Sequence, residues 1–173
     1  MILKEYLSKE FIYSNLHKID AVLRRKNLYL NLRIVGGAGL IFNGITSIDT
    51  SDIDTLDKLT QEIKDICSDS SLDINDDVLD YLDNFNSLDS EFLEDNEESF
   101  SNITISYLNT AGIVFTKLKN CQDEDKMENL RFLLEDELDI EMTVKGISEY
   151  LEDYSIVPNT EDIVEFLKGI GYL

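Results

Sequence analysis

A predicted strand that runs directly into two glycines is the feature that most limits how this chain can fold. Residues 28–35 (LYLNLRIV) alternate apolar and polar side chains and are followed at once by Gly36 and Gly37. Alternation with a period of two predicts a half-buried strand. The apolar segment 38–43 predicts a short helix that ends at Gly44. Because a glycine has no side chain, the turn between strand and helix leaves backbone N–H groups accessible to a phosphate.

Two aspartates lie one residue apart in the next apolar segment. Residues 52–56 (DIDTL) predict a short strand in which Asp52 and Asp54 face one side and Ile53 faces the other. Two carboxylates on one face can hold a hard divalent cation against the phosphates of a nucleotide. The pattern therefore raises the question of whether the glycine turn and the aspartate pair open onto one pocket.

The remaining apolar periodicity predicts a chain rich in helices with few strands. A strand is expected over 102–107, and residues 84–100 are expected to form an acidic surface loop with a helical turn around 91–93. The predicted helices cover 3–26 (with a break near Ser8), 57–67, 75–83, 110–119, 124–137, 143–153 and 161–169. This order of elements predicts an α+β or α/β domain with a small sheet and a helical C-terminal part.

The charge of the chain is large, negative and unevenly distributed. The net charge is −21, with a net of +4 over residues 1–33 and of −16 over residues 49–100. Contacts with nucleic acid and with anionic membranes need Lys and Arg, so most of this surface should repel both. Such a surface attracts cations and basic proteins instead. The alternative is that the acidity serves solubility alone.

The sequence also indicates a cytoplasmic location. The first residues (MILKE) have no continuous apolar segment of the kind found in a signal peptide, and no run of about 18 apolar residues predicts a membrane span. Cys67 and Cys121 do not have the spacing of a metal site, and both are expected to be reduced thiols.

Two groups of residues carry a resemblance to a known family. The strings VGGAGL at residues 35–40 and TSDID at residues 50–54 resemble the signature of the nucleotidyltransferase superfamily. The likeness is greatest to the minimal nucleotidyltransferases of bacterial abortive-infection and toxin–antitoxin systems, and fourteen residues separate Gly37 from Asp52. Downstream, FTKLK at 115–119 and NLRFLL at 129–134 resemble the helix pair of that family.

The resemblance implies a fold and a reaction. The fold would be the α+β nucleotidyltransferase fold, a small mixed sheet flanked by helices, with a core over residues 1–120 and a helical region over residues 121–173 packed on it. The reaction would be the Mg²⁺-dependent transfer of a nucleoside monophosphate from a nucleoside triphosphate to a hydroxyl group. Asp52 and Asp54 would hold the metal and carry catalysis. The residues that would bind the nucleotide are Gly36, Gly37, Thr50, Ser51 and Lys117.

The acceptor and the activity are open at this point. The acidic surface favours a protein acceptor over a nucleic acid, although Arg24, Arg25, Lys26 and Arg33 could form a local patch for a tRNA end. The predicted strand at 102–106 has no carboxylate to act as general base for the attacking hydroxyl. The alternative reading is therefore an inactive protein of the same fold, such as an antitoxin that sequesters a basic toxin.

Overall fold

A computed structural model of the chain describes residues 7–45, 50–78, 93–96, 98–109 and 112–113. The chain separates into two compact units, Met1–Asn109 and Thr110–Leu173, and every element described below belongs to the first. The predicted boundary after residue 120 and the predicted helices from residue 124 onward lie outside the described residues. They remain predictions.

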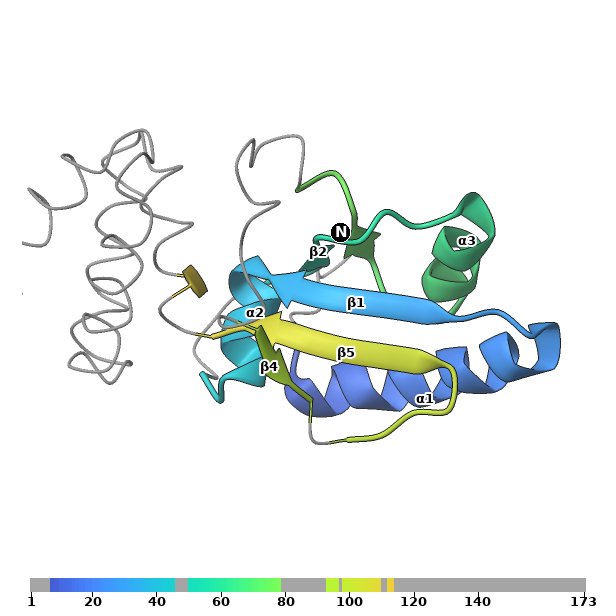
Figure 1. Cartoon of the computed structure of the whole chain (residues 1–173), viewed down its shortest axis with the longest axis horizontal. Helices are drawn as coiled ribbons and strands as arrows, with labels where there is room; N and C mark the ends of the chain where they lie inside the picture. The colour runs from blue at the N-terminus through green and yellow to red at the C-terminus, as the bar shows by residue number, and fades with distance from the viewer. Residues whose placement is uncertain (1–6, 46–49, 79–92, 97, 110–111, 114–173) are drawn as a thin grey trace, which may run out of the picture. The chain divides into compact units, whose positions relative to one another are not determined.

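The first unit is built on a mixed sheet of five strands in the order β3-β2-β1-β5-β4 (Figure 1). The central strands β1 and β5 are parallel, β2 is antiparallel to β1 and parallel to β3, and β4 is antiparallel to β5. This architecture confirms the predicted α+β class with a small mixed sheet. The strands are β1 (Leu30–Val35), β2 (Ile53–Thr55), β3 (Ile74–Asn75), β4 (Leu93–Asp95) and β5 (Ile103–Leu108).

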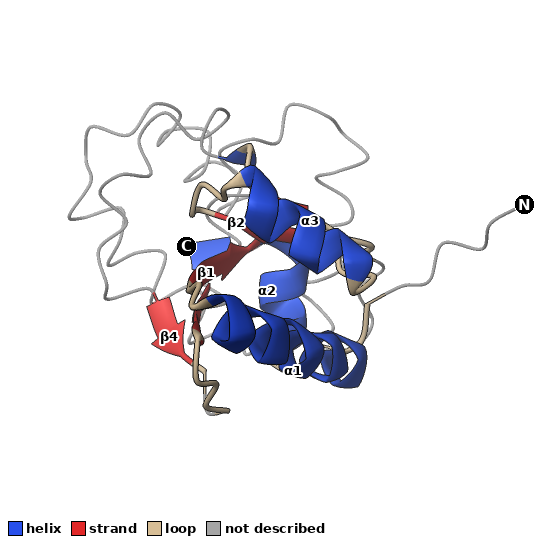
Figure 2. Ribbon diagram, turned by 90° about the vertical axis from the view of Figure 1, so that its right-hand side faces the viewer, coloured by secondary structure: helices blue, strands red, loops and turns tan. Residues whose placement is uncertain are grey.

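Three helices lie on one face of this sheet (Figure 2). They are α1 (Lys9–Lys26), α2 (Gly36–Phe42) and α3 (Gln61–Asp69). Ser8 caps α1, in agreement with the predicted break near this residue: its Oγ accepts a hydrogen bond from the backbone N–H of Phe11 at 3.1 Å. The predicted helical residues 3–6 lie outside the described part of the chain. Thr60 caps α3 in the same way, so this helix begins at Gln61 and not at residue 57.

The core lies between the helices and the sheet. On β1, Leu30, Leu32 and Ile34 are buried whereas Asn31 is exposed, as the alternation predicted. Their neighbours on β5 follow the same pattern, since Leu30 lies opposite Ile103. The helices contribute apolar side chains to the same cluster: Ile12, Leu16, Ile19, Leu23, Ala38, Ile41, Phe42, Ile63 and Ile66.

Two short strands contradict the sequence interpretation. Residue 75, the first of the helix predicted over 75–83, lies in β3, and residues 93–95 form β4, where the sequence predicts a loop with a helical turn around 91–93. Residues 79–83 and 91–92 of these predicted segments lie outside the described residues. Each strand is defined by its partner, β2 for β3 and β5 for β4, and not by a local pattern. Segments of two and three residues are too short to show an alternation, which is why periodicity missed them.

Among the described residues, no helix combines the length and the apolar character that a membrane crossing requires.

Candidate functional site

Gly36 and Asp54 lie in direct contact where β1 leads into α2. Val35 ends β1 and pairs with Asp54 of β2, which places the aspartate beside the following glycine. Gly36 has a φ of +63°, and a Cβ at this position would lie 2.6 Å from Oδ2 of Asp54. Only glycine fits this conformation without strain and leaves room for the carboxylate. The glycine turn and one of the two predicted aspartates therefore share one site.

The other oxygen of Asp54 is held from the opposite side. Nδ2 of Asn75 donates a hydrogen bond of 2.8 Å to Oδ1 of Asp54, and the two residues are register partners in β2 and β3. Sequence reasoning missed Asn75, because residue 75 was assigned to the start of a helix. The local sequence, LDIN at residues 72–75, alternates over four residues only, which is too few to predict a strand.

The structure also describes four further predicted site residues: Gly37, Thr50, Ser51 and Asp52. Asp52 immediately precedes β2, so the strand is shorter than the predicted 52–56 and includes only Asp54 of the pair. Oγ1 of Thr50 donates to the backbone carbonyl of Asp52 at 3.3 Å, and Ser51 between them is half-buried. Gly37 is half-buried in the first turn of α2.

Lys117, the predicted cation of the site, lies outside the described residues. Its place relative to Asp54 is therefore not described, and its role remains a prediction.

Asp57, in the segment after β2, forms an ion pair with Arg33. Nε and Nη2 of Arg33 each lie 3.0 Å from Oδ1 of Asp57, and the backbone N–H of Arg33 donates to Oδ2 at 2.8 Å. Asn31 adds a hydrogen bond of 3.2 Å to the same Oδ1. This carboxylate ties β1 to the segment after β2 and does not belong to the candidate site.

The basic residues suggested for a tRNA end are partly engaged elsewhere. Arg33 is paired with Asp57, and Lys26 pairs with Glu62 of α3 at 2.7 Å. Arg24 and Arg25 are exposed in the last turn of α1, where cations complement the helix dipole. Two of the four cations therefore already have carboxylate partners.

Asp76, next to Asn75, is buried and serves the fold. Its Oδ1 accepts a hydrogen bond from Nζ of Lys64 at 2.7 Å, and its Oδ2 accepts from the backbone N–H of Leu59 at 2.9 Å. Burial alone would raise the pKa of this carboxyl group, but the bonds from Lys64 and Leu59 outweigh it and hold the pKa below its ordinary value. The Asp76 hydrogen bond in turn raises the pKa of Lys64.

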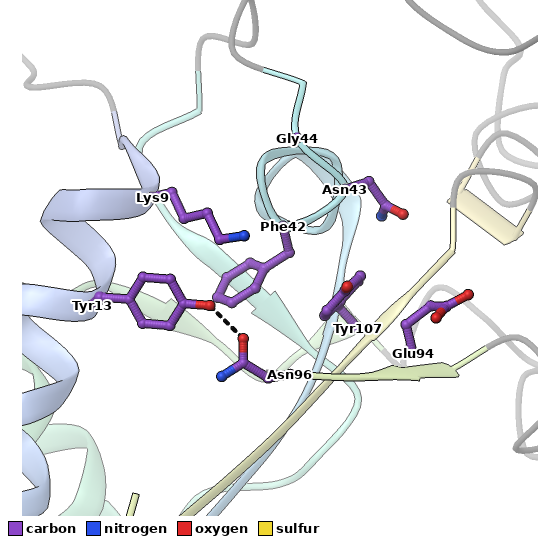
Figure 3. Close-up of a pocket in the computed structure, with 8 residues that line it drawn as sticks. All are labelled: Lys9, Tyr13, Phe42, Asn43, Gly44, Glu94, Asn96 and Tyr107. Atoms are coloured by element: carbon purple, nitrogen blue, oxygen red, sulfur yellow. Dashed lines mark hydrogen bonds between the residues drawn. The ribbon is translucent and has the colours of Figure 1, made fainter. Parts of the chain in front are cut away.

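A pocket of about 400 Å³ opens elsewhere, between the start of α1, the end of α2 and the strands β4 and β5 (Figure 3). The rings of Tyr13, Phe42 and Tyr107 line it, with centroids 5.7 Å apart for the first pair and 5.4 Å for the second. Tyr13 also donates its hydroxyl to Oδ1 of Asn96. None of the predicted site residues lines this pocket.

Comparison with known proteins identifies the family of the chain. No curated protein and no solved structure matches the chain significantly. Residues 14–169, most of the chain, match the family described as nucleotidyltransferase of unknown function, DUF6036. The mixed sheet with its helices on one face is consistent with a nucleotidyltransferase fold. The chain therefore belongs to the DUF6036 family of nucleotidyltransferases of unknown function.

Proposed function

We propose that this chain transfers a nucleoside monophosphate from a nucleoside triphosphate to an acceptor hydroxyl and releases pyrophosphate. The contact between Gly36 and Asp54 is the observation that carries the proposal. It places an acidic side chain against a backbone turn that has no side chain of its own. A triphosphate needs both features, since its oxygens take hydrogen bonds from backbone N–H groups and its charge needs a bound cation.

In this proposal a magnesium ion binds at Asp54 and its neighbour Asp52. Mg²⁺ prefers oxygen ligands and is typically held by one or two carboxylates together with water and phosphate oxygens. Asp52 and Asp54 would supply those carboxylates. Among the described residues, no group of three or more His, Cys, Asp or Glu side chains could hold a metal ion. When bound, the ion neutralises charge on the phosphates and orients them for in-line displacement.

The chain's own residues would bind the rest of the nucleotide. In this proposal the backbone N–H groups of Gly36 and Gly37 contact the terminal phosphates. The hydroxyl of Ser51, or that of Thr50 after it releases the carbonyl of Asp52, donates to a phosphate oxygen. Lys117 brings a positive charge to the triphosphate. Each of these groups binds or orients the substrate, so their loss should weaken nucleotide binding before any chemistry takes place.

The net charge of −21 favours a protein acceptor over RNA. We place the reaction in the cytoplasm, within a toxin–antitoxin or phage-defence system of the kind that the sequence resembles. The free, buried thiol of Cys67 is in keeping with a reducing compartment.

One observation favours a second candidate, a binding protein without catalysis. The strand β5, next to β1, carries no carboxylate, and the side chain that contacts Asp54 from β3 is the neutral Asn75. Neither β3 nor β5 therefore supplies a carboxylate as general base for the attacking hydroxyl. In this alternative the acidic surface sequesters a basic partner, such as a toxin.

Thermal-shift titrations with ATP, CTP, GTP and UTP, each with and without MgCl₂, test nucleotide binding. We expect a magnesium-dependent rise in Tm with at least one nucleotide, and its loss when Asp52→Asn is combined with Asp54→Asn. The matched control combines Asp65→Asn with Asp69→Asn, which changes the net charge equally on the exposed face of α3. This control should keep the shift. No shift with any nucleotide would contradict the proposal.

Incubation with α-³²P-labelled nucleotides separates the two candidates. Label that appears on the protein or on added tRNA, with release of pyrophosphate, supports transfer. Magnesium-dependent nucleotide binding without any labelled acceptor supports the binding protein instead.

A further inference from the structure

We infer that Asn75 is a positioning residue that fixes the metal-binding carboxylate of Asp54. The inference rests on the proposed function, because it assigns a role toward the divalent cation of that site. The amide of Asn75 is not part of the sequence signature of the site. It reaches Asp54 only because β3 pairs with β2.

The orientation of the Asn75 amide is set by its own partners. Its Oδ1 accepts a hydrogen bond of 3.1 Å from the backbone N–H of Asp77. Since that N–H can only donate, the oxygen of the amide must face Asp77 and the NH₂ group must face Asp54. The 2.8 Å bond from Nδ2 to Oδ1 of Asp54 is therefore the arrangement that satisfies both ends of the amide.

The backbone holds Asn75 in place for this contact. Besides the pairing of Asn75 with Asp54, Ile74 pairs with Ile53, and the N–H of Ile53 donates to the carbonyl of Asp73 at 2.9 Å. The Asp54 carboxylate thus lies between a neutral amide on β3 and the bare backbone of Gly36 on the other side. The Asn75 amide therefore holds Oδ1 of Asp54 before any ligand arrives.

The pair of Asn31 and Asp57 provides a comparison for the asparagine amide alone. There too an asparagine donates to an aspartate, and Arg33 pairs with the same carboxylate. Asn75 restrains Asp54 and contributes no charge to it. A restraint of this kind suits a carboxylate that has to attract a cation, because hydrogen-bonding partners of metal ligands orient them without competing for the metal.

The test is a titration with Mn²⁺, a paramagnetic substitute for Mg²⁺, followed by electron paramagnetic resonance of the free ion. It compares the wild-type chain, Asn75→Ala, Asp54→Asn and the matched control Asn31→Ala. Loss of a partner of a metal ligand typically weakens metal binding about 10–100-fold. We expect a loss of that size for Asn75→Ala, abolition of binding for Asp54→Asn and wild-type affinity for Asn31→Ala.

Urea unfolding of the same variants tests whether a substitution has unfolded the protein and not only changed the affinity for Mn²⁺. If Asn75→Ala does not fold, Asn75→Thr replaces it, because threonine suits a strand and its side chain lacks the amide nitrogen. Wild-type Mn²⁺ affinity in a folded Asn75 variant would overturn the inference alone. Absence of Mn²⁺ binding by the wild-type chain would overturn the proposed function, and the inference with it.

Discussion

A Cβ at position 36 would lie 2.6 Å from Oδ2 of Asp54, whereas a Cβ at position 44 would meet no atom within 4 Å. Both glycines have positive φ angles, +63° at Gly36 and +89° at Gly44. The two positions therefore separate the cost of an unusual backbone conformation from the cost of displacing the carboxylate.

The first prediction compares Gly36→Ala with Gly44→Ala. Each should lose about 1–2 kcal/mol of stability, because an L-residue in the left-handed region is strained. Gly36→Ala should lose more, since Asp54 must also move, and it should lose the magnesium-dependent nucleotide shift. Urea unfolding and thermal-shift titrations measure both effects. Equal stability and equal nucleotide shifts in the two variants would show that the contact with Asp54 has no consequence.

The second prediction concerns the buried carboxylate of Asp76. Asp76→Asn should destabilise the protein at pH 7 by about 1–3 kcal/mol, because the amide NH₂ would face one of the two donors, Lys64 or the N–H of Leu59. Urea unfolding at pH 7 measures this loss. The exposed Asp65→Asn on α3 is the control and should have little effect.

Asp76 also sets an expected dependence of stability on pH. The pKa of Asp76 in the folded protein lies below the ordinary value of 3.8. Its contribution to the free energy of unfolding is therefore fully present above pH 3.8 and is lost as the pH falls through the pKa of the folded state. Lys64 has a raised pKa, so its contribution is present below 10.5 and is lost at higher pH. As the pH is lowered into the acid range, the free energy of unfolding of Asp76→Asn should therefore fall less than that of the wild type. An unchanged acid dependence would contradict this role.

The third prediction concerns the reactivity of Cys67. Burial raises the pKa of this thiol to about 11, so at pH 8 only about one molecule in a thousand carries the thiolate. In a Cys121→Ser background, the folded protein should react with a disulfide reagent far more slowly than the protein in urea. The absorbance of the released thiol measures both rates. A fast reaction in the folded state would place Cys67 at the surface.

The fourth prediction concerns the start of α1. Ser8→Ala should cost about 1 kcal/mol, because the backbone N–H of Phe11 loses its hydrogen-bond acceptor. The same substitution at Ser14, an exposed position inside α1, should be neutral or slightly stabilising, because alanine has the higher helix propensity. Equal unfolding midpoints for the two variants would rule out the cap.

Strong local patterns predicted the central elements of the fold. The strands at Leu30–Val35 and Ile103–Leu108 and the helix at Lys9–Lys26 each carry a periodicity several residues long, and their positions were close to those expected. The strands β3 and β4 could not be found in this way. Their hydrogen bonds depend on β2 and β5, which are distant in the sequence, and each is too short to show a pattern.

The same limit applies to the candidate site. Gly36 and Asp54 could be predicted to meet, because a glycine turn after a strand and an aspartate on the next strand are local features with a recognisable spacing. Asn75 could not be predicted, since its contact with Asp54 exists only once β3 has paired with β2. The local sequence also did not reveal that Asp57 and Asp76 serve structural pairs, because Arg33 and Lys64 reach them through the tertiary fold.

Among the described strands, β3 and β4 are the outermost ones, and each pairs with a described strand on one side only. A free edge of this kind offers backbone groups with which another molecule can pair. Exposed carboxylates accompany both edges: Asp73 and Asp77 beside β3, and Glu94 and Asp95 on β4. Like charges at both edges oppose the growth of a shared intermolecular sheet. That protection disappears as the pH approaches the isoelectric point of about 4.1, where β-rich aggregates of this chain should form most readily.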